Sequence, residues 1–396
     1  MFAIVQIPLL ILILFIHTYV SDDRSNPAFW VDAFITSLAR TAVPCYFFMS
    51  GYLLFSIHDS FTPSNYARLL RSRFFSLFIP YMIWVCVPYV ITRLQGRTFW
   101  VSPREIIPFF YSTDYGWYSQ PSLLGYYFDV IQPPGGNYVL WYVRDLMVFI
   151  LFAPLIRFGL GYIKKAATPI CVTALILNIG LAGYPATALW SFLLGCSLGH
   201  DRTDFLPLCR RLAPIAMPCW AAFAAMYVWS NTSLPSDAAS DSLQGVFSIN
   251  LSILCGGIAI FGIASIIDGR GSAGFPYSAK LVNLLIALAP ASFFVYVTHA
   301  IDPATRLSFL TDSLVADPYW RPSVSYFAFN IVRLAVLIVI YFLLARLLPR
   351  TMSMLTGGRS LRRRVVNADR CAPASAPAGT ASEGPSGCAR SDEAAS

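Results

Sequence analysis

Charged residues are scarce in this chain, and the scarcity limits what the protein can be. Only 12% of the 396 residues are Asp, Glu, Lys or Arg, while 57% are hydrophobic and the mean hydropathy is +0.61. An average soluble domain has roughly 25% charged residues. The composition therefore excludes an ordinary soluble protein and predicts one that lies in a membrane.

The sequence also lacks any cysteine motif. None of the nine cysteines stands in a CxxC pair or at the spacing of metal ligands, and most fall in apolar stretches. They are Cys45, Cys86, Cys171, Cys196, Cys209, Cys219, Cys255, Cys371 and Cys388. We expect them to fill small apolar spaces, so the sequence predicts neither a disulfide framework nor a metal site.

No polar linker long enough to separate two domains interrupts the apolar stretches. Most of these stretches approach the roughly 20 residues that a helix needs to cross a bilayer. The ten stretches cover about residues 3–20, 29–57, 75–92, 139–162, 167–181, 185–199, 212–229, 245–267, 281–301 and 325–348. The fifth and sixth are short and could instead form one re-entrant pair. The sequence predicts an all-α, polytopic transmembrane bundle over residues 1–349, then a basic and finally disordered tail over residues 350–396.

Lysine and arginine are distributed unevenly between the two sides of such a bundle. Alternate loops together with the C-terminal tail hold 19 of the 28, whereas the opposite loops hold 6. Because positively charged loops stay in the cytoplasm, both termini are expected there. The net charge of +8 then reflects topology and does not indicate nucleic-acid binding. We expect a multi-pass protein of the bacterial inner membrane.

Two outer connections are longer than a turn. Residues 93–138 are rich in Tyr, Trp, Phe and Pro, and residues 302–324 carry aromatic and acidic side chains. Aromatic side chains suit the headgroup level of a bilayer. They could equally stack on sugar rings, so both interpretations stay open.

The few strongly polar residues within the apolar stretches fall at a similar depth. At a rise of about 1.5 Å per residue, five different spans bring such residues to the outer half of the membrane. They are His17, Arg40, Arg144 with Asp145, His299 and Arg333. Ionisable groups inside a membrane are costly and usually face the bundle interior or a wet cavity. The pattern therefore predicts one shared site near the outer face.

Each of these residues also has a purely structural interpretation. His17 could be an interfacial histidine, and His299 could simply end a helix. Arg144 and Asp145 could satisfy each other, or could pair with the arginines of the second and last spans. A neutral imidazole in a wet pocket can take a proton from a hydroxyl while a nearby cation stabilises an oxyanion. These groups suffice for acyl transfer to an alcohol, but the pattern alone does not select it over proton-coupled transport.

Five stretches resemble the acyltransferase-3 family of integral membrane acyltransferases. The most specific is RTAVPCYFFMSGY at residues 40–52, close to the family signature R-x-A-V-P-x-F-F-x-x-S-G-Y/F. The others are FIH at 15–17, RFFSLFIPYMIW at 73–84, LWYVRDL at 140–146 and SFFVYVTH at 292–299. The likeness runs from the first span to about residue 301, and the last span fits by hydropathy only. One departure is Gln6, where the family commonly has a basic residue eleven positions before the first-helix histidine.

The resemblance implies an enzyme that O-acylates a hydroxyl of a cell-surface carbohydrate or lipid-linked glycan. The donor would be an acyl-CoA, most simply acetyl-CoA, which enters from the cytosol as a cosubstrate, with no permanently bound cofactor. The implied catalytic residues are His17 as general base, Arg40 or Arg144 as a polarising cation, and Asp145 to orient a cation. Further pocket candidates are Trp141, His299 and Arg333.

Three arginines that precede the third span could bind the donor. Arg68, Arg71 and Arg73 either hold its phosphates or are solvated loop residues.

Two rival functions also stay open on the sequence. One is a membrane transporter or channel for a small solute or glycan, without acyl transfer, and the other is a structural subunit of a surface-polymer complex.

Overall fold

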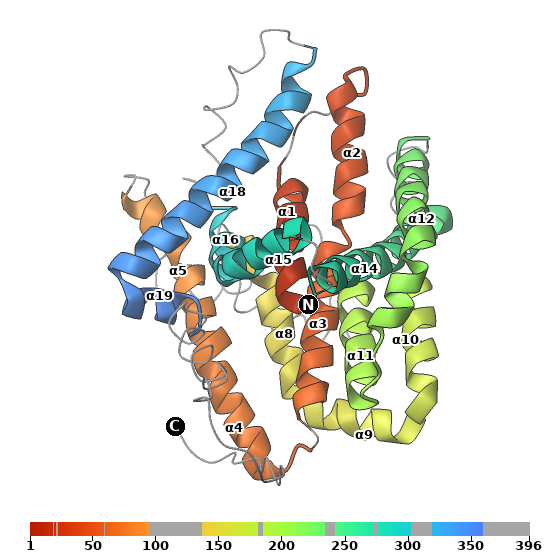
Figure 1. Cartoon of the computed structure of the whole chain (residues 1–396), viewed down its shortest axis with the longest axis vertical. Coiled ribbons are helices and arrows are strands. Elements are labelled where there is room, and N and C mark those ends of the chain that lie inside the picture. The colour runs from red at the N-terminus through yellow and green to blue at the C-terminus, as the bar shows by residue number, and fades with distance from the viewer. Residues whose placement is uncertain are drawn as a thin grey trace, which may run out of the picture. The chain divides into compact units, whose positions relative to one another are not determined.

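The computed structural model describes residues 1–18, 20, 23–58, 60–94, 137–180, 185–233, 242–272, 276–301 and 319–358. Every regular element within these ranges is a helix (Figure 1), which confirms the predicted all-α class. These residues belong to one compact unit, Met1–Ser360. Most of the two outer connections, and the whole tail beyond residue 358, lie outside the described residues.

Apart from the two at residues 63–73 and 349–355, the α-helices overlap the predicted apolar stretches. In chain order they are α1 (Phe2–Ile16), α2 (Pro27–Ala39), α3 (Ala42–Ile57), α4 (Pro63–Arg73), α5 (Ile79–Leu94), α8 (Trp141–Leu151), α9 (Ala153–Ile163), α10 (Ala167–Ile176), α11 (Ala186–His200), α12 (Leu206–Ser233), α14 (Leu243–Ser272), α15 (Pro276–Leu288), α16 (Ser292–Thr298), α18 (Arg321–Leu347) and α19 (Pro349–Leu355). Shorter helical turns are η1 (Phe74–Phe78), η3 (Tyr138–Leu140), η4 (Lys164–Ala166) and η5 (Ala289–Ala291).

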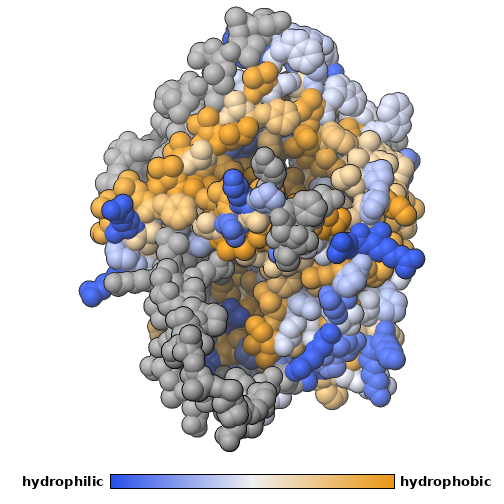
Figure 2. All heavy atoms as spheres, in the orientation of Figure 1, coloured by the Kyte–Doolittle hydropathy of each residue, from blue (hydrophilic) through white to orange (hydrophobic). Residues whose placement is uncertain are grey.

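Five helical stretches in the described part are long and apolar enough to cross a membrane, and a sixth is added if the bent α8–α10 segment counts as one span. The protein is therefore an integral membrane protein, while the count of ten crossings and the cytosolic termini stay predictions. Large apolar side chains cover much of its surface, as the broad orange area across the face in Figure 2 shows. Such a surface suits contact with lipid.

Three predicted spans differ in detail from the structure. The second is divided at Arg40 and Thr41 into α2 and α3, and Pro27 begins α2 behind an Asn26 side chain that caps it. The fourth is not one straight helix, because the chain bends by 64° at Phe152, just before Pro154. The third begins earlier than expected, since α4, η1 and α5 follow one another without a break from residue 63 to 94.

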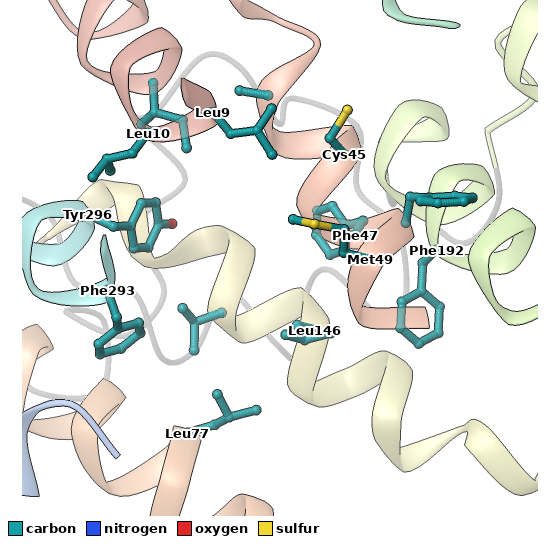
Figure 3. Close-up of a cluster of buried hydrophobic side chains, with 14 of the residues drawn as sticks. Leu9, Leu10, Cys45, Phe47, Met49, Leu77, Leu146, Phe192, Phe293 and Tyr296 are labelled. Atoms are coloured by element: carbon teal, nitrogen blue, oxygen red, sulfur yellow. The ribbon is translucent and has the colours of Figure 1, made fainter. Parts of the chain in front are cut away.

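Helix α1 occupies the middle of the bundle in Figure 1 and packs against α2, α3, α15, α16 and α18. A cluster of buried apolar side chains fills the space between α1, α3, α8, α11 and α16 (Figure 3). Leu9 and Leu10 enter it from α1, Phe47 from α3 and Leu146 from α8. This core holds together the helices whose ends carry the polar residues.

Helices α3 and α11 approach each other closely because glycines line their contact. A methyl group on Gly195 would come within 2.9 Å of the Tyr52 backbone nitrogen, and closer still to the carbonyl oxygen of Phe48. Gly51 and Gly199 have similarly close backbone neighbours on the opposite helix. Small residues of this kind allow membrane helices to pack backbone against backbone.

We therefore expect Gly195→Ala to destabilise the protein by about 1–3 kcal/mol, because the added methyl must push α3 and α11 apart. Thermal unfolding in detergent would show this as a lower midpoint. Gly161→Ala on α9 is the matched control, since no described atom beyond its own turn of helix lies within 4 Å of the position of the new methyl group. Equal unfolding midpoints for the two variants would contradict the close contact.

Candidate active site

Two histidines from distant parts of the chain meet where their helices end. His17 directly follows α1, and His299 directly follows α16. Their ring centres lie 5.2 Å apart, with 43° between the ring planes. His299 is fully buried and His17 is half-buried. The structure thus brings together the histidines of the first and ninth predicted spans.

The hydrogen bonds of His299 define its tautomer. Its Nδ1 lies 2.7 Å from the backbone carbonyl oxygen of Tyr296. A carbonyl oxygen only accepts hydrogen bonds, so Nδ1 carries the proton and donates it. In the neutral ring Nε2 then has a free lone pair, and this atom has no hydrogen-bond partner among the described residues. The Nε2 atom of His299 is therefore a buried acceptor next to His17.

Arg333 of α18 joins its own helix to the ends of α1 and α16. Its Nη2 lies 2.7 Å from the Leu14 carbonyl oxygen, 2.8 Å from Thr18 Oγ1 and 2.5 Å from Asn330 Oδ1. Its Nη1 lies 3.5 Å from the carbonyl oxygen of His299. The side chain is 1% exposed. We call His17, Thr18, His299, Asn330 and Arg333 the histidine–arginine cluster.

Arg144 and Asp145 pair with each other, which is the first of the two alternatives that the sequence left open. The Arg144 Nε lies 3.0 Å from Asp145 Oδ1, and the two side chains are 8% and 1% exposed. Tyr81 of α5 is within electrostatic range of both and is buried as well. Trp141, which begins α8, has its ring centre 6.0 Å from that of Phe47.

The start of α8 is tied to the helix that carries His299. The Asn137 side chain donates a hydrogen bond of 2.6 Å to the Val297 carbonyl oxygen. The Tyr296 hydroxyl donates to the carbonyl oxygen of Val139. These bonds fix the beginning of α8, with its Arg144–Asp145 pair, against α16.

Arg40 contacts a different part of the bundle. It follows the last residue of α2, and its Cζ atom lies 5.3 Å from the ring centre of Tyr227 on α12. A guanidinium at this distance from an aromatic face is stabilised by cation–π attraction. The arginine that forms hydrogen bonds with the residues around His17 is Arg333. The sequence indicated Arg333 only as a further pocket candidate.

The three arginines of α4 differ in their surroundings, and all three lie on a helix instead of the predicted loop. Arg68 and Arg71 are exposed. Arg73 is half-buried and lies within electrostatic range of Tyr142 on α8, and its Nε has no hydrogen-bond partner among the described residues. Burial and the nearby Arg73 lower the pKa of His58, which follows α3. Arg73 therefore faces the interior between α3, α4 and α8.

Sequence reasoning gave no role to Asp32, Tyr326 or Asn330. Tyr326, Asn330 and Arg333 are spaced i, i+4 and i+7 on α18, so they share one helix face, and each is at most 3% exposed. This polar stripe on an apolar helix is the sequence pattern that could have pointed to Tyr326 and Asn330. Asp32, an acid within an apolar stretch, was another.

Comparison with known proteins agrees with this geometry. Residues 6–349 match the sequence model of the acyltransferase domain family Acyl_transf_3. The chain belongs to this family and is a membrane acyltransferase. It is 25% identical over 350 residues to the succinoglycan biosynthesis protein ExoH of Rhizobium meliloti (strain 1021), over 85% of this chain and 84% of that protein. No solved structure matches the chain.

Proposed function

We propose that the protein moves an acyl group, most simply acetyl, from acyl-CoA to a hydroxyl of a polysaccharide or lipid-linked glycan in the bacterial inner membrane. The observation that carries this proposal is the histidine pair, 5.2 Å between ring centres, held beside the buried Arg333. Because this histidine pair occurs in a member of the acyltransferase family, it supports acyl transfer. The relative from Rhizobium meliloti, named for succinoglycan biosynthesis, supports a polysaccharide as acceptor.

In the proposed reaction His17 acts as the general base. It removes the proton of the acceptor hydroxyl while the oxygen attacks the carbonyl carbon of the thioester. The new C–O bond replaces the C–S bond, and the leaving thiolate takes the proton back from His17. The lone pair on His299 Nε2 is available to accept a hydrogen bond from the protonated His17 ring.

A cation near the histidines would stabilise the negative charge that develops on the carbonyl oxygen. Arg333 is suited to this because it is buried and oriented by the hydrogen bonds that it donates to the ends of α1 and α16 and to Asn330 on its own helix. Arg144 is a second candidate, and Asp145 would orient it, as the 3.0 Å contact allows. Arg40, stacked on Tyr227, would act from the side of α12.

The donor would approach from the cytosolic side, with its phosphates at Arg68, Arg71 and Arg73. A line of aromatic side chains supports this route. Arg73 lies near Tyr142, whose ring centre is 6.0 Å from that of Tyr296. The Tyr296 ring centre is in turn 6.2 Å from that of His299. The acyl end of a bound coenzyme would follow this line toward the histidine pair.

Label transfer tests the proposed function directly. Purified protein in detergent would receive radiolabelled acetyl-CoA and base-deacylated cell-envelope glycan. We expect label in the glycan, with release of free coenzyme A in equal amount. Absence of label from every glycan fraction, together with solute flux through proteoliposomes that contain no coenzyme, would favour the transporter instead.

Arg73→Gln should raise the KM for acetyl-CoA by about tenfold, because a hydrogen bond to a charged phosphate contributes roughly 1.5–3 kcal/mol. The KM for glycan should stay within about twofold of the wild-type value. Steady-state kinetics with each substrate varied in turn would measure both. Arg211→Gln, at an exposed position on α12, is the control. An unchanged donor KM would leave Arg73 without a part in phosphate binding.

A further inference from the structure

One carboxylate at the outer end of α2 has no part in the proposed chemistry. Asp32 is half-buried, and its Oδ1 accepts a hydrogen bond of 3.1 Å from the Thr36 hydroxyl. The Tyr326 hydroxyl of α18 is close enough to interact with the carboxylate. Within the described ranges no lysine or arginine forms an ion pair with Asp32. A carboxylate at membrane depth without a cation is costly, and such groups usually belong to a functional site.

Polar side chains lead from Asp32 to the histidine–arginine cluster, and hydrogen bonds join them from Tyr326 onward. The Tyr326 hydroxyl lies 3.4 Å from the carbonyl oxygen of Phe15, in the last turn of α1. The Asn330 side chain donates to the carbonyl oxygen of Tyr326 over 2.9 Å, and Asn330 in turn accepts from Arg333. From Tyr326 to Arg333 the stripe extends about 10 Å along α18. A continuous polar strip therefore leads from Asp32 to the histidine pair.

Two further aromatic rings pack around Tyr326, the residue that interacts with this carboxylate. The ring centre of Phe15 is 5.0 Å from that of Tyr326 and 5.6 Å from that of Phe327. The ring centres of Tyr326 and Phe327 are 5.4 Å apart, and Phe327 is 39% exposed. A pyranose presents hydroxyl groups along its rim and C–H groups on its faces. The hydroxyls suit a carboxylate acceptor, and the C–H faces suit aromatic rings.

We propose that Asp32, Thr36, Tyr326 and Phe327 form a subsite for the acceptor, which holds a pyranose ring next to the one that receives the acyl group. The subsite lies at the N-terminal ends of α2 and α18, which the predicted topology places on the extracytoplasmic side. The acceptor therefore enters from outside, opposite to the donor. This inference rests on the proposed acyltransferase function and adds to it a binding site and a direction of entry.

Acceptor kinetics test the subsite. We expect Asp32→Asn, which keeps the size of the side chain and removes its charge, to raise the KM for deacylated envelope glycan about tenfold or more. The KM for acetyl-CoA should change by less than about twofold. Tyr326→Phe, which removes the hydroxyl and keeps the ring, should shift the glycan KM in the same direction. Asp23→Asn in the exposed turn before α2 is the matched control and should behave as wild type.

The direction of entry has its own assay. Right-side-out vesicles loaded with labelled acetyl-CoA should label glycan that is added outside, whereas glycan enclosed with the donor in the lumen should stay unlabelled. A glycan KM that is unchanged in both Asp32→Asn and Tyr326→Phe would overturn the subsite, as would labelling of the enclosed glycan alone. If Asp32→Asn fails to fold, Tyr326→Phe decides the question. Wild-type protein that transfers no label at all would instead contradict the proposed function.

Discussion

His17→Ala should reduce transfer of labelled acetyl groups to glycan by about 100-fold to 10,000-fold, the usual contribution of a general base. The reason is that an alcohol is a weak nucleophile until its proton is removed. Because His17 lies beyond the last turn of α1, its loss should leave the bundle folded. Binding of acetyl-CoA, measured by isothermal titration calorimetry, should keep its wild-type affinity.

The matched control for this experiment is His200→Ala. His200 is at the cytosolic end of α11 by the predicted topology, where its Nδ1 lies 2.9 Å from Asp201 Oδ1. Its removal should leave turnover within about twofold of wild type. Should His17→Ala retain more than a tenth of the wild-type turnover while His200→Ala is unaffected, His17 would not be the base. His299 would then be the first alternative, because it provides the other imidazole of the pair.

The meeting of His17 and His299 could be predicted from the sequence, because the level of a residue in a span follows from helix rise and from where each apolar stretch begins. That reasoning placed His17 and His299 at one level, and the structure puts them in contact. The all-α class followed from the same apolar stretches. The sequence predicted a loop for Arg68, Arg71 and Arg73, because charged residues indicate exposure to water. Exposure to water does not show where a helix ends. In the structure all three lie on α4.

Partner choice among the buried charges could not be predicted, because it depends on how each helix is rotated and where it breaks. Arg40 lies at the break between α2 and α3. A second span treated as one unbroken helix therefore predicts the wrong direction for its side chain. Its ring partner, Tyr227, is nearly 190 residues further along the chain. Arg144 and Asp145 are neighbours in sequence, and successive residues on a helix do not normally face each other. Their contact required the side chains to bend toward one another.

Arg333→Met should lower both stability and turnover, because it removes the donor that links the ends of α1 and α16 to α18. The substitution removes this donor from the Leu14 carbonyl oxygen and from Asn330 Oδ1. The Thr18 hydroxyl lies 2.9 Å from both but has a single proton, so it can donate to only one of them. The other buried acceptor loses a partner, at a cost of about 1–3 kcal/mol. Thermal unfolding in detergent should therefore show a clearly lower midpoint. Label transfer by the protein that stays folded should be at least about 100-fold slower, as expected when an oxyanion-stabilising group is lost.

Arg333→Lys separates the charge of this residue from its geometry. Lysine keeps the positive charge, but its single ammonium group cannot reproduce the planar fork that contacts α1, α16 and α18 together. We expect it to fold better than the methionine variant and still to transfer label at least about tenfold more slowly than wild type. Arg346→Lys, exposed near the end of the same helix, provides the control. Wild-type turnover in Arg333→Lys would mean that charge alone matters at this position. Wild-type turnover in Arg333→Met would mean that Arg333 takes no part in the reaction.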